Sequence, residues 1–135
     1  MAHLQEITGD AACKFLQNFR LIDPSGCATV QTETTGAQCF CLSLPGGQVV
    51  YCLRMLAGLA WVTVAASNCR GQVTGQVLPL IERQALQMGA AALGFQTARR
   101  GLIRRATAAG YRCWPLMQGD KQTGARLEKA LHDDA

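Results

Sequence analysis

The chain has 135 residues, 49% hydrophobic side chains and a net charge of +4. This length matches one ordinary domain, and the apolar content is sufficient to bury a core without disulfides or metals. A secreted disulfide framework normally uses an even number of cysteines and follows a signal peptide. The seven cysteines are an odd number, and residues 1–6 lack a basic start and an apolar segment, so we do not expect such a framework. No run reaches the roughly 18 apolar residues of a membrane span. We therefore expect a single domain over residues 1–135 in a reducing compartment, most simply the cytoplasm, with no membrane contact.

The N-terminal part of the chain predicts a helix followed by strands. After a short apolar start at residues 3–7, Thr8 or Asp10 can cap a helix. Its apolar residues recur at i, i+3, i+4 and i+7: Ala12, Phe15, Leu16 and Phe19. The Asp-Pro-Ser-Gly sequence at 23–26 ends this helix as a turn, and the β-branched residues of 27–32 predict the start of a strand.

Three strands are predicted next. Residues 37–44 and 48–56 flank the Pro-Gly-Gly sequence at 45–47, which indicates a hairpin. The Ala-Gly pair at 57–58 then separates the second of these strands from a third at residues 59–65.

A turn at residues 68–75 leads into a second helix, which Gly89 ends as a C-terminal cap. The apolar positions of this helix are Val77, Leu80, Ile81, Ala85 and Met88. Pro79 requires that the helix begins no earlier than about Gly75 or is kinked. Residues 90–95 are apolar on both faces, as in a central parallel strand.

The C-terminal part predicts two further helices with a strand between them. Thr97 can cap a helix that has Leu102, Ile103 and Ala106 facing inward and that ends at Gly110. Residues 113–117 predict a strand that Pro115 interrupts, and residues 123–131 predict a last, more polar helix.

This order of elements resembles the fold of the Gcn5-related N-acetyltransferases (GNAT). The resemblance covers nearly the whole chain as an N-terminal helix, an antiparallel meander, and a strand–turn–helix–strand–helix series that closes on Gly110 and Tyr111. It implies an α/β (α+β) fold with a mixed, mostly antiparallel sheet, splayed near residues 59–65 and 90–95, and helices on both faces.

The turn before the second helix is similar to the Gln/Arg-x-x-Gly-x-Gly/Ala turn with which this family wraps the pyrophosphate of acyl-CoA. The resemblance implies acetyl-CoA as the cofactor and a binding turn made of Arg70, Gly71, Val73, Thr74 and Gly75. Val73 occupies the position of the family's middle glycine, with Gly71 and Gly75 on either side.

Two catalytic groups of the family have no counterpart in this sequence. Ala106 stands where members often carry a tyrosine that reprotonates the leaving thiolate, and residues 59–65 contain no ionisable base. General acid or base catalysis commonly contributes about 10²–10⁴-fold. The catalytic residues are therefore unknown, and the resemblance implies a slow or degenerate N-acyltransferase.

Arg99 and Arg100 fall in the first turn of the helix that Thr97 would cap. Cations are unfavourable at this end of the helix dipole unless an anion is nearby. We therefore include both arginines in the cofactor-binding site, as partners of a phosphate; the alternative is that they are exposed, solvated side chains. Arg104 and Arg105 extend this basic face, but no pattern of stacking aromatic residues accompanies them, which disfavours nucleic acid as a partner.

The cysteines allow a metal site or a buried apolar role. Cys39 and Cys41 would point to one face of a strand, but no second pair completes four zinc ligands, so we predict buried thiols and no metal.

Two classes of function therefore compete. The first is an acyl-CoA-binding protein that is a slow or degenerate N-acyltransferase. The second is a non-catalytic interaction protein with the GNAT fold, of the kind found among bacteriophage virion and accessory proteins, which would place it in a virion. Because a splayed sheet can recruit a neighbour's strand, a homodimer or another protein partner also stays open.

Overall fold

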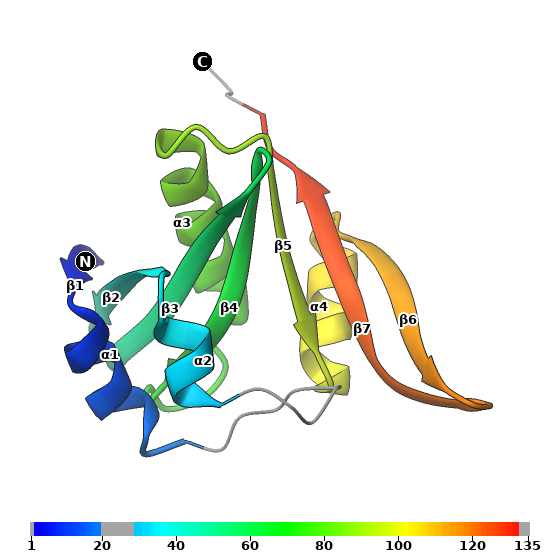
Figure 1. The fold of residues 1–135 in the computed structure, drawn as a ribbon, viewed down its shortest axis with the longest axis horizontal. Coiled ribbons are helices and arrows are strands. Elements are labelled where there is room, and N and C mark those ends of the chain that lie inside the picture. Colours follow the sequence, from blue (N-terminus) through cyan, green and yellow to red (C-terminus); the bar gives the residue numbers. More distant parts are fainter. Residues whose placement is uncertain (1, 20–28, 133–135) are drawn as a thin grey trace. The chain divides into compact units, whose positions relative to one another are not determined.

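A computed structural model describes residues 2–19 and 29–132 of the chain (Figure 1). In chain order its elements are β1 (His3–Ile7), α1 (Gly9–Leu16), α2 (Val30–Thr34), β2 (Gln38–Leu44), β3 (Gly47–Leu56), β4 (Leu59–Ser67), α3 (Thr74–Gln87), β5 (Ala92–Thr97), α4 (Arg100–Ala108), β6 (Arg112–Gln118) and β7 (Lys121–Ala130). The predicted turn at 23–26 lies outside the described residues. None of the helices described is long and apolar enough to cross a membrane.

The strands form one mixed, mostly antiparallel sheet. Their hydrogen-bonded order is β1-β2-β3-β4-β5-β7-β6. β4 and β5 are parallel and pair only through residues 59–61 and 92–94, whereas β1–β2, β2–β3, β5–β7 and β6–β7 are antiparallel. The predicted fold class is confirmed.

Backbone contacts divide the chain into two compact units. Of the residues that the structure describes, the first unit contains 2–19, 29–54 and 62–72, and the second contains 55–61 and 73–132. Strand β4 therefore begins in the second unit and ends in the first. A single domain over residues 1–135 stays a prediction.

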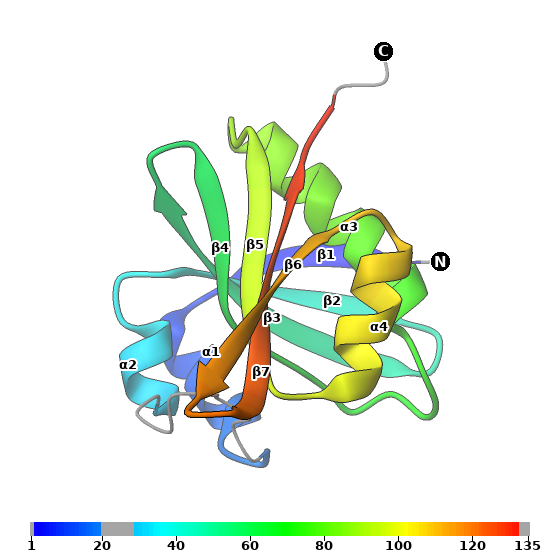
Figure 2. The ribbon, with the colours of Figure 1, turned by 90° about the vertical axis from the view of Figure 1, so that its right-hand side faces the viewer.

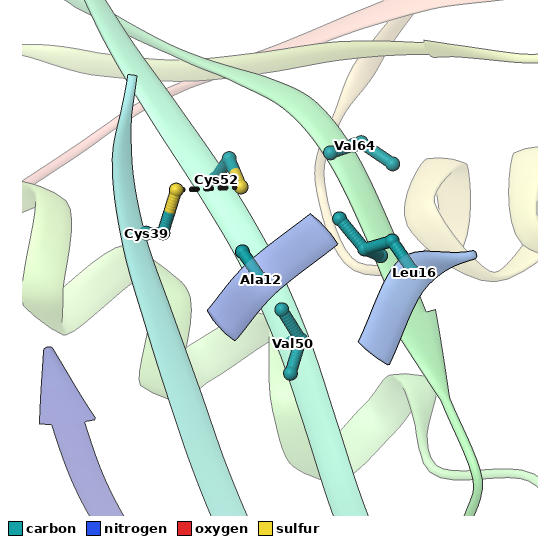
Figure 3. Packing of buried hydrophobic residues seen from close by; sticks show 6 residues of the cluster. All are labelled: Ala12, Leu16, Cys39, Val50, Cys52 and Val64. Atoms are coloured by element: carbon teal, nitrogen blue, oxygen red, sulfur yellow. Dashed lines mark hydrogen bonds between the residues drawn. The ribbon is translucent and has the colours of Figure 1, made fainter. Parts of the chain in front are cut away.

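The core of the first unit lies between α1 and the strands beneath it (Figure 3). Its buried members are Ala12, Leu16, Cys39, Val50, Cys52 and Val64. Thr8 caps α1 as predicted, since its hydroxyl accepts a hydrogen bond from the Ala11 N–H at 3.1 Å. The helix ends at Leu16, one turn before the predicted Phe19, whose ring instead stacks on Phe15 with 5.2 Å between centroids.

The predicted strand at 27–32 is wrong for the residues that the structure describes, because Val30–Thr34 forms α2. Thr29 and Thr32 make a capping box: the Thr29 hydroxyl accepts from the Thr32 N–H at 3.1 Å, and the Thr32 hydroxyl accepts from the Thr29 N–H at 2.9 Å. The threonines that suggested a strand by their β-branching thus start a helix through their hydroxyl groups.

The hairpin between β2 and β3 and the strand β4 confirm the predictions for this region. Residues Leu44 and Gly47 face each other at the turn, and Ala57 and Gly58 have positive φ angles of 52° and 86° between β3 and β4. α3 begins at Thr74 and continues through Pro79.

In the second unit, β5 pairs with β7, and β7 pairs with β6 (Figure 2). α3 packs on β5, and α4 packs on β7 and β6. The predicted strands at 90–95 and 113–117 are confirmed as β5 and β6, with shifted ends, and β6 includes Pro115. Gly89 and Gly110 follow α3 and α4 with φ angles of 89° and 98°, as predicted for C-terminal caps.

The predicted last helix at 123–131 is wrong, because residues 123–130 belong to strand β7 and Leu131 follows the end of that strand. Gly119, with a φ of 63°, turns the chain back between the facing residues Gln118 and Lys121. Ala125 and Leu127 are fully buried, while Arg126 between them is exposed. This period of two is typical of a strand, and the Gly-Asp turn before it was the missed signal.

The core of the first unit generates a stability prediction. Leu16 is fully buried and Leu4 is 36% exposed. We expect Leu16→Ala to lower the free energy of unfolding by about 2–5 kcal/mol because it leaves a cavity. Leu4→Ala, the same chemical change at an exposed site, should have a much smaller effect. Denaturant unfolding measures both, and equal losses would contradict the packing described here.

Candidate functional site

The turn before α3 begins at Asn68, which forms two hydrogen bonds with Gln48 of β3. The Asn68 N–H donates to the Gln48 carbonyl at 3.1 Å, and the Asn68 Oδ1 accepts from the Gln48 N–H at 2.7 Å. Arg70 and Gly71 follow and are exposed, with Gly71 at a φ of 73°. Both residues belong to the first unit. The chain is therefore fixed up to Asn68 and turns at Gly71, where glycine is free of strain.

The start of α3 belongs to the second unit. Val73 is its N-cap residue and makes no side-chain capping bond, and the first turn contains no acidic residue. A Cβ placed on Gly75 would meet no atom within 4 Å, so the backbone there borders open space. The first N–H groups of a helix have no acceptor inside the helix, and this end carries partial positive charge. Together these features suit an anion.

The start of α4 has the same character. Arg99 is the N-cap residue and Arg100 is the first helical residue; both are exposed, and no side-chain cap or first-turn acid is present. The prediction that Thr97 caps this helix is wrong. Thr97 is the last residue of β5, and its hydroxyl accepts from the Arg99 N–H at 3.1 Å, before the helix begins. β5 extends two residues beyond its predicted end because Gln96 and Thr97 pair with β7, and the helix therefore begins later in the sequence.

The two helix starts are related by the path of the chain. α3 leads into β5 and α4 leads out of it, and both helices run back against the direction of β5 (Figure 1). Their N-termini therefore point toward the carboxyl end of β5. The structure places residues 73–75 and the pair Arg99 and Arg100 in one unit, and Arg70 and Gly71 in the other.

A charged cluster that the sequence did not reveal lies in the middle of the second unit. The Glu82 carboxylate accepts hydrogen bonds from the Tyr111 hydroxyl at 2.8 Å and from Lys129 Nζ at 3.2 Å. Tyr111 is 3% exposed, and its ring lies 5.6 Å from that of Phe95. Burial, reinforced by the bond to Glu82, raises the pKa of Tyr111 above its usual range. These contacts agree with a packing role for Tyr111.

A cavity of about 130 Å³ adjoins this cluster, and it is lined by Glu82, Leu86, Lys129, Ala130, Leu131 and His132. Glu82 and Leu86 lie in the second half of α3, whereas Thr74 and Gly75 lie in its first turn. At about 1.5 Å of rise per residue, the cavity is more than 10 Å from the helix start. It is therefore separate from the candidate anion site.

Cys39 and Cys52 of the first unit are buried in its core, as predicted. The prediction of buried thiols is wrong for Cys113, which is exposed, and Cys13, Cys41 and Cys69 are only half-buried. Cys39 and Cys52 face each other on β2 and β3, and the Cys52 thiol donates to the Cys39 sulfur at 3.1 Å. Burial raises the pKa of Cys52, and its hydrogen bond with Cys39 raises it further, which keeps this thiol protonated and unreactive. Among residues 2–19 and 29–132, no three His, Cys, Asp or Glu side chains are grouped to hold a metal ion.

Solved structures match the chain over nearly its whole length. An acetyltransferase of Bacillus subtilis in complex with CoA is 18% identical over 97% of this chain and 98% of its own, with a TM-score of 0.66. The ribosomal-protein-S18-alanine N-acetyltransferase of Escherichia coli is 14% identical over 97% and 93%, with a TM-score of 0.67. A GNAT-family acetyltransferase of Streptococcus pneumoniae is 9% identical over 98% and 100%, with a TM-score of 0.58.

These similarities define the class of fold. No protein-family model and no curated protein sequence matches the chain. The chain has the fold of the GNAT acetyltransferases, which confirms the resemblance found in the sequence.

Both tyrosines of the chain, Tyr51 and Tyr111, are buried, which generates a pH prediction. Burial also raises the pKa of Tyr51. Because the native state favours the neutral phenols, their contribution to stability is complete below the unfolded-state pKa of about 10 and is lost as pH rises above it. We expect the free energy of unfolding to fall from about pH 9 to about pH 11, and the slope to be smaller in Tyr111→Phe.

Phenolate absorbance provides the direct measurement. The native protein should show little phenolate signal near the usual tyrosine pKa, whereas the denatured protein should titrate normally. Tyr51→Phe is the matched control for Tyr111→Phe, because it removes the other buried phenol and leaves the hydrogen bond between Tyr111 and Glu82 intact. A full phenolate signal in native protein near pH 10 would contradict the burial of both rings.

Proposed function

We propose that the chain binds acyl-CoA and transfers its acyl group slowly to an amine. The observation that carries this proposal is the pair of helix starts in the second unit: α3 and α4 both begin without a side-chain cap or an acid. α1 and α2, by contrast, are capped by Thr8 and Thr29. The fold shared with an acetyltransferase in complex with CoA supports the choice of ligand.

In this proposal the pyrophosphate of acyl-CoA lies at the start of α3. The backbone of Val73, Thr74 and Gly75 borders the ligand, and the open space beside Gly75 leaves room for it. Arg99 and Arg100 supply positive charge from the neighbouring helix start. Arg70 and Gly71 precede the helix in the sequence and are the remaining residues of the predicted binding turn. Phosphate groups bind readily where a helix N-terminus and free cations combine.

Bound acyl-CoA would supply an activated thioester, and the chain would supply orientation. β4 carries no ionisable side chain, and Ala106, fully buried in α4, offers no proton. Thr63 on β4 is also engaged, since its hydroxyl donates to the Glu33 carbonyl at 2.6 Å. Alignment of the amine with the thioester is then the main source of rate, and solvent accepts and returns the protons. We infer a slow transferase, with acetyl-CoA as the first acyl donor to test.

Two of these observations, on Ala106 and on β4, also support the non-catalytic candidate. A buried alanine and an uncharged β4 favour a protein that retains the fold, and even the acyl-CoA site, without transferring the acyl group. The bacteriophage setting of that candidate stays a prediction.

Calorimetric titration with acetyl-CoA tests the binding site. We expect Arg99→Ala combined with Arg100→Ala to weaken binding about 10-fold or more, since two charge-assisted phosphate contacts are lost. Arg104→Ala removes the same charge one turn further along α4 and is the matched control. The difference between the variants should shrink as salt rises, because both arginines are exposed.

Release of free CoA thiol in the presence of amine acceptors tests the reaction. Binding with thiol release supports the transferase, and binding without release supports the non-catalytic candidate. Absence of acetyl-CoA binding at millimolar concentration would overturn the acyl-CoA assignment.

A further inference from the structure

Among the residues that the structure describes, one face of the sheet in the second unit carries no helix of that unit. The ring of Phe95 contacts Tyr111, which bonds to Glu82 of α3, so α3 and the end of α4 lie on the Phe95 side of β5. Gly94 and Gln96 point to the other side, and Gln96 is exposed. In Figure 1, strands β5, β7 and β6 lie in front of α4, with no helix of the second unit in front of them.

The strand register brings aromatic and charged residues together on this side. Trp61, Gly94, Glu128 and Arg112 face one another across four strands in one row. The next row holds Gln96, Arg126 and Trp114. Residues that face one another across a ladder point to the same side of the sheet. We call the following residues the helix-free face: Trp61, Gln96, Arg112, Trp114, Arg126 and Glu128.

Each tryptophan of this face is paired with an arginine. The Arg126 guanidinium lies 5.4 Å from the Trp61 ring centroid, and that of Arg112 lies 5.1 Å from the Trp114 ring centroid. Glu128 forms an ion pair with Arg126. Trp114 is 40% exposed and the Arg126 side chain 45%. The face therefore offers one exposed aromatic ring, Trp114, and one half-buried ring, Trp61, each with a guanidinium group beside it.

The charge around the face favours an anionic partner. Between residues 73 and 132 arginine and lysine greatly outnumber acids, which are Glu82, Asp120 and Glu128. Glu82 is held by Tyr111 and Lys129 on the other side of the sheet. Glu128 is thus the one acid of the helix-free face within the described residues.

We propose that the helix-free face binds single-stranded nucleic acid, with bases stacked on Trp61 and Trp114 and phosphates paired with Arg112 and Arg126. Four-stranded sheets that present aromatic side chains stack two or three bases in this way. Stacking of a base on an aromatic ring exceeds an exposed arginine–aromatic contact, so a base can replace the guanidinium, which then turns to a phosphate. This proposal does not depend on acyl-CoA binding.

Geometry and chemistry select a single strand over other anions. Trp61 lies on β4 and Trp114 on β6, three strand spacings apart, with β5 and β7 between them. At a strand spacing of about 4.8 Å they are separated by roughly 14 Å, which an extended single strand can span. A duplex keeps its bases stacked and cannot cover the rings, and an acidic peptide would use the arginines but not the tryptophans.

Fluorescence provides the first test, because Trp61 and Trp114 are the only tryptophans of the chain. A single-stranded oligonucleotide of mixed sequence, added without acyl-CoA, should quench the fluorescence of both. Trp61→Phe leaves Trp114 as the single reporter and should still show quenching. Quenching of equal size by the matching duplex or by poly-glutamate would overturn the proposal.

Anisotropy of a labelled oligonucleotide measures the variants. Trp114→Ala should weaken binding about 10-fold or more, whereas Trp114→Phe, which keeps a ring, should retain most of the affinity. Arg112→Ala should reduce the slope of log affinity against log salt by about 0.7, the value for one phosphate contact on a single strand. Glu128→Gln should tighten binding because it removes the acid of the face.

Two controls separate this face from the other basic surfaces. Arg104→Ala removes an equal charge from α4, on the helix side of the sheet, and should leave the quenching unchanged. CoA should not displace the oligonucleotide if the strand lies on the helix-free face. Displacement by CoA, or unchanged affinity in Trp114→Ala, would overturn the proposal whether or not acetyl-CoA binds.

Discussion

The second unit depends on one shared carboxylate. Glu82 in α3 receives the hydroxyl of Tyr111, just after α4, and the ammonium of Lys129 in β7. A partly buried acid is tolerated only when its oxygens are satisfied, and here each oxygen is satisfied by a different element. The bonds therefore fix the rotation of α3 relative to α4 and β7. That rotation decides where the uncapped starts of α3 and α4 point and which side of the sheet is left without a helix.

The two sides of this sheet consequently have different chemical characters. On the helix side, apolar residues such as Leu93 and Leu127 are fully buried, and the helix starts offer backbone N–H groups and exposed arginines to an anion. On the other side, the groups that we propose to bind an anion are guanidinium groups beside tryptophan rings. Both proposed ligands carry phosphates, but different interactions would bind them. Helix termini favour a compact diphosphate, and flat aromatic surfaces favour unstacked bases.

Much of the fold could be predicted from local signals, and the failures have identifiable causes. The hairpin at 45–47 and the caps at Gly89 and Gly110 follow from backbone preferences that few residues satisfy. The helix at 30–34 was missed because threonine favours strands by shape but caps helices through its hydroxyl. The candidate phosphate site, which stays a prediction, could be suggested from sequence because each of its two parts, residues 70–75 and the pair Arg99 and Arg100, is a short contiguous segment. The Glu82 cluster and the helix-free face could not be predicted from sequence, since strand register and helix packing assemble them from distant segments.

Pro115 has a consequence for self-association. It lies in β6, the last strand of the hydrogen-bonded order, and proline contributes no N–H to a ladder. A strand added beyond β6 from another molecule would meet a border that is poorer in donors and irregular at the bulge between Leu116 and Met117. Such borders discourage edge-to-edge aggregation, so this end of the sheet resists growth into fibrils.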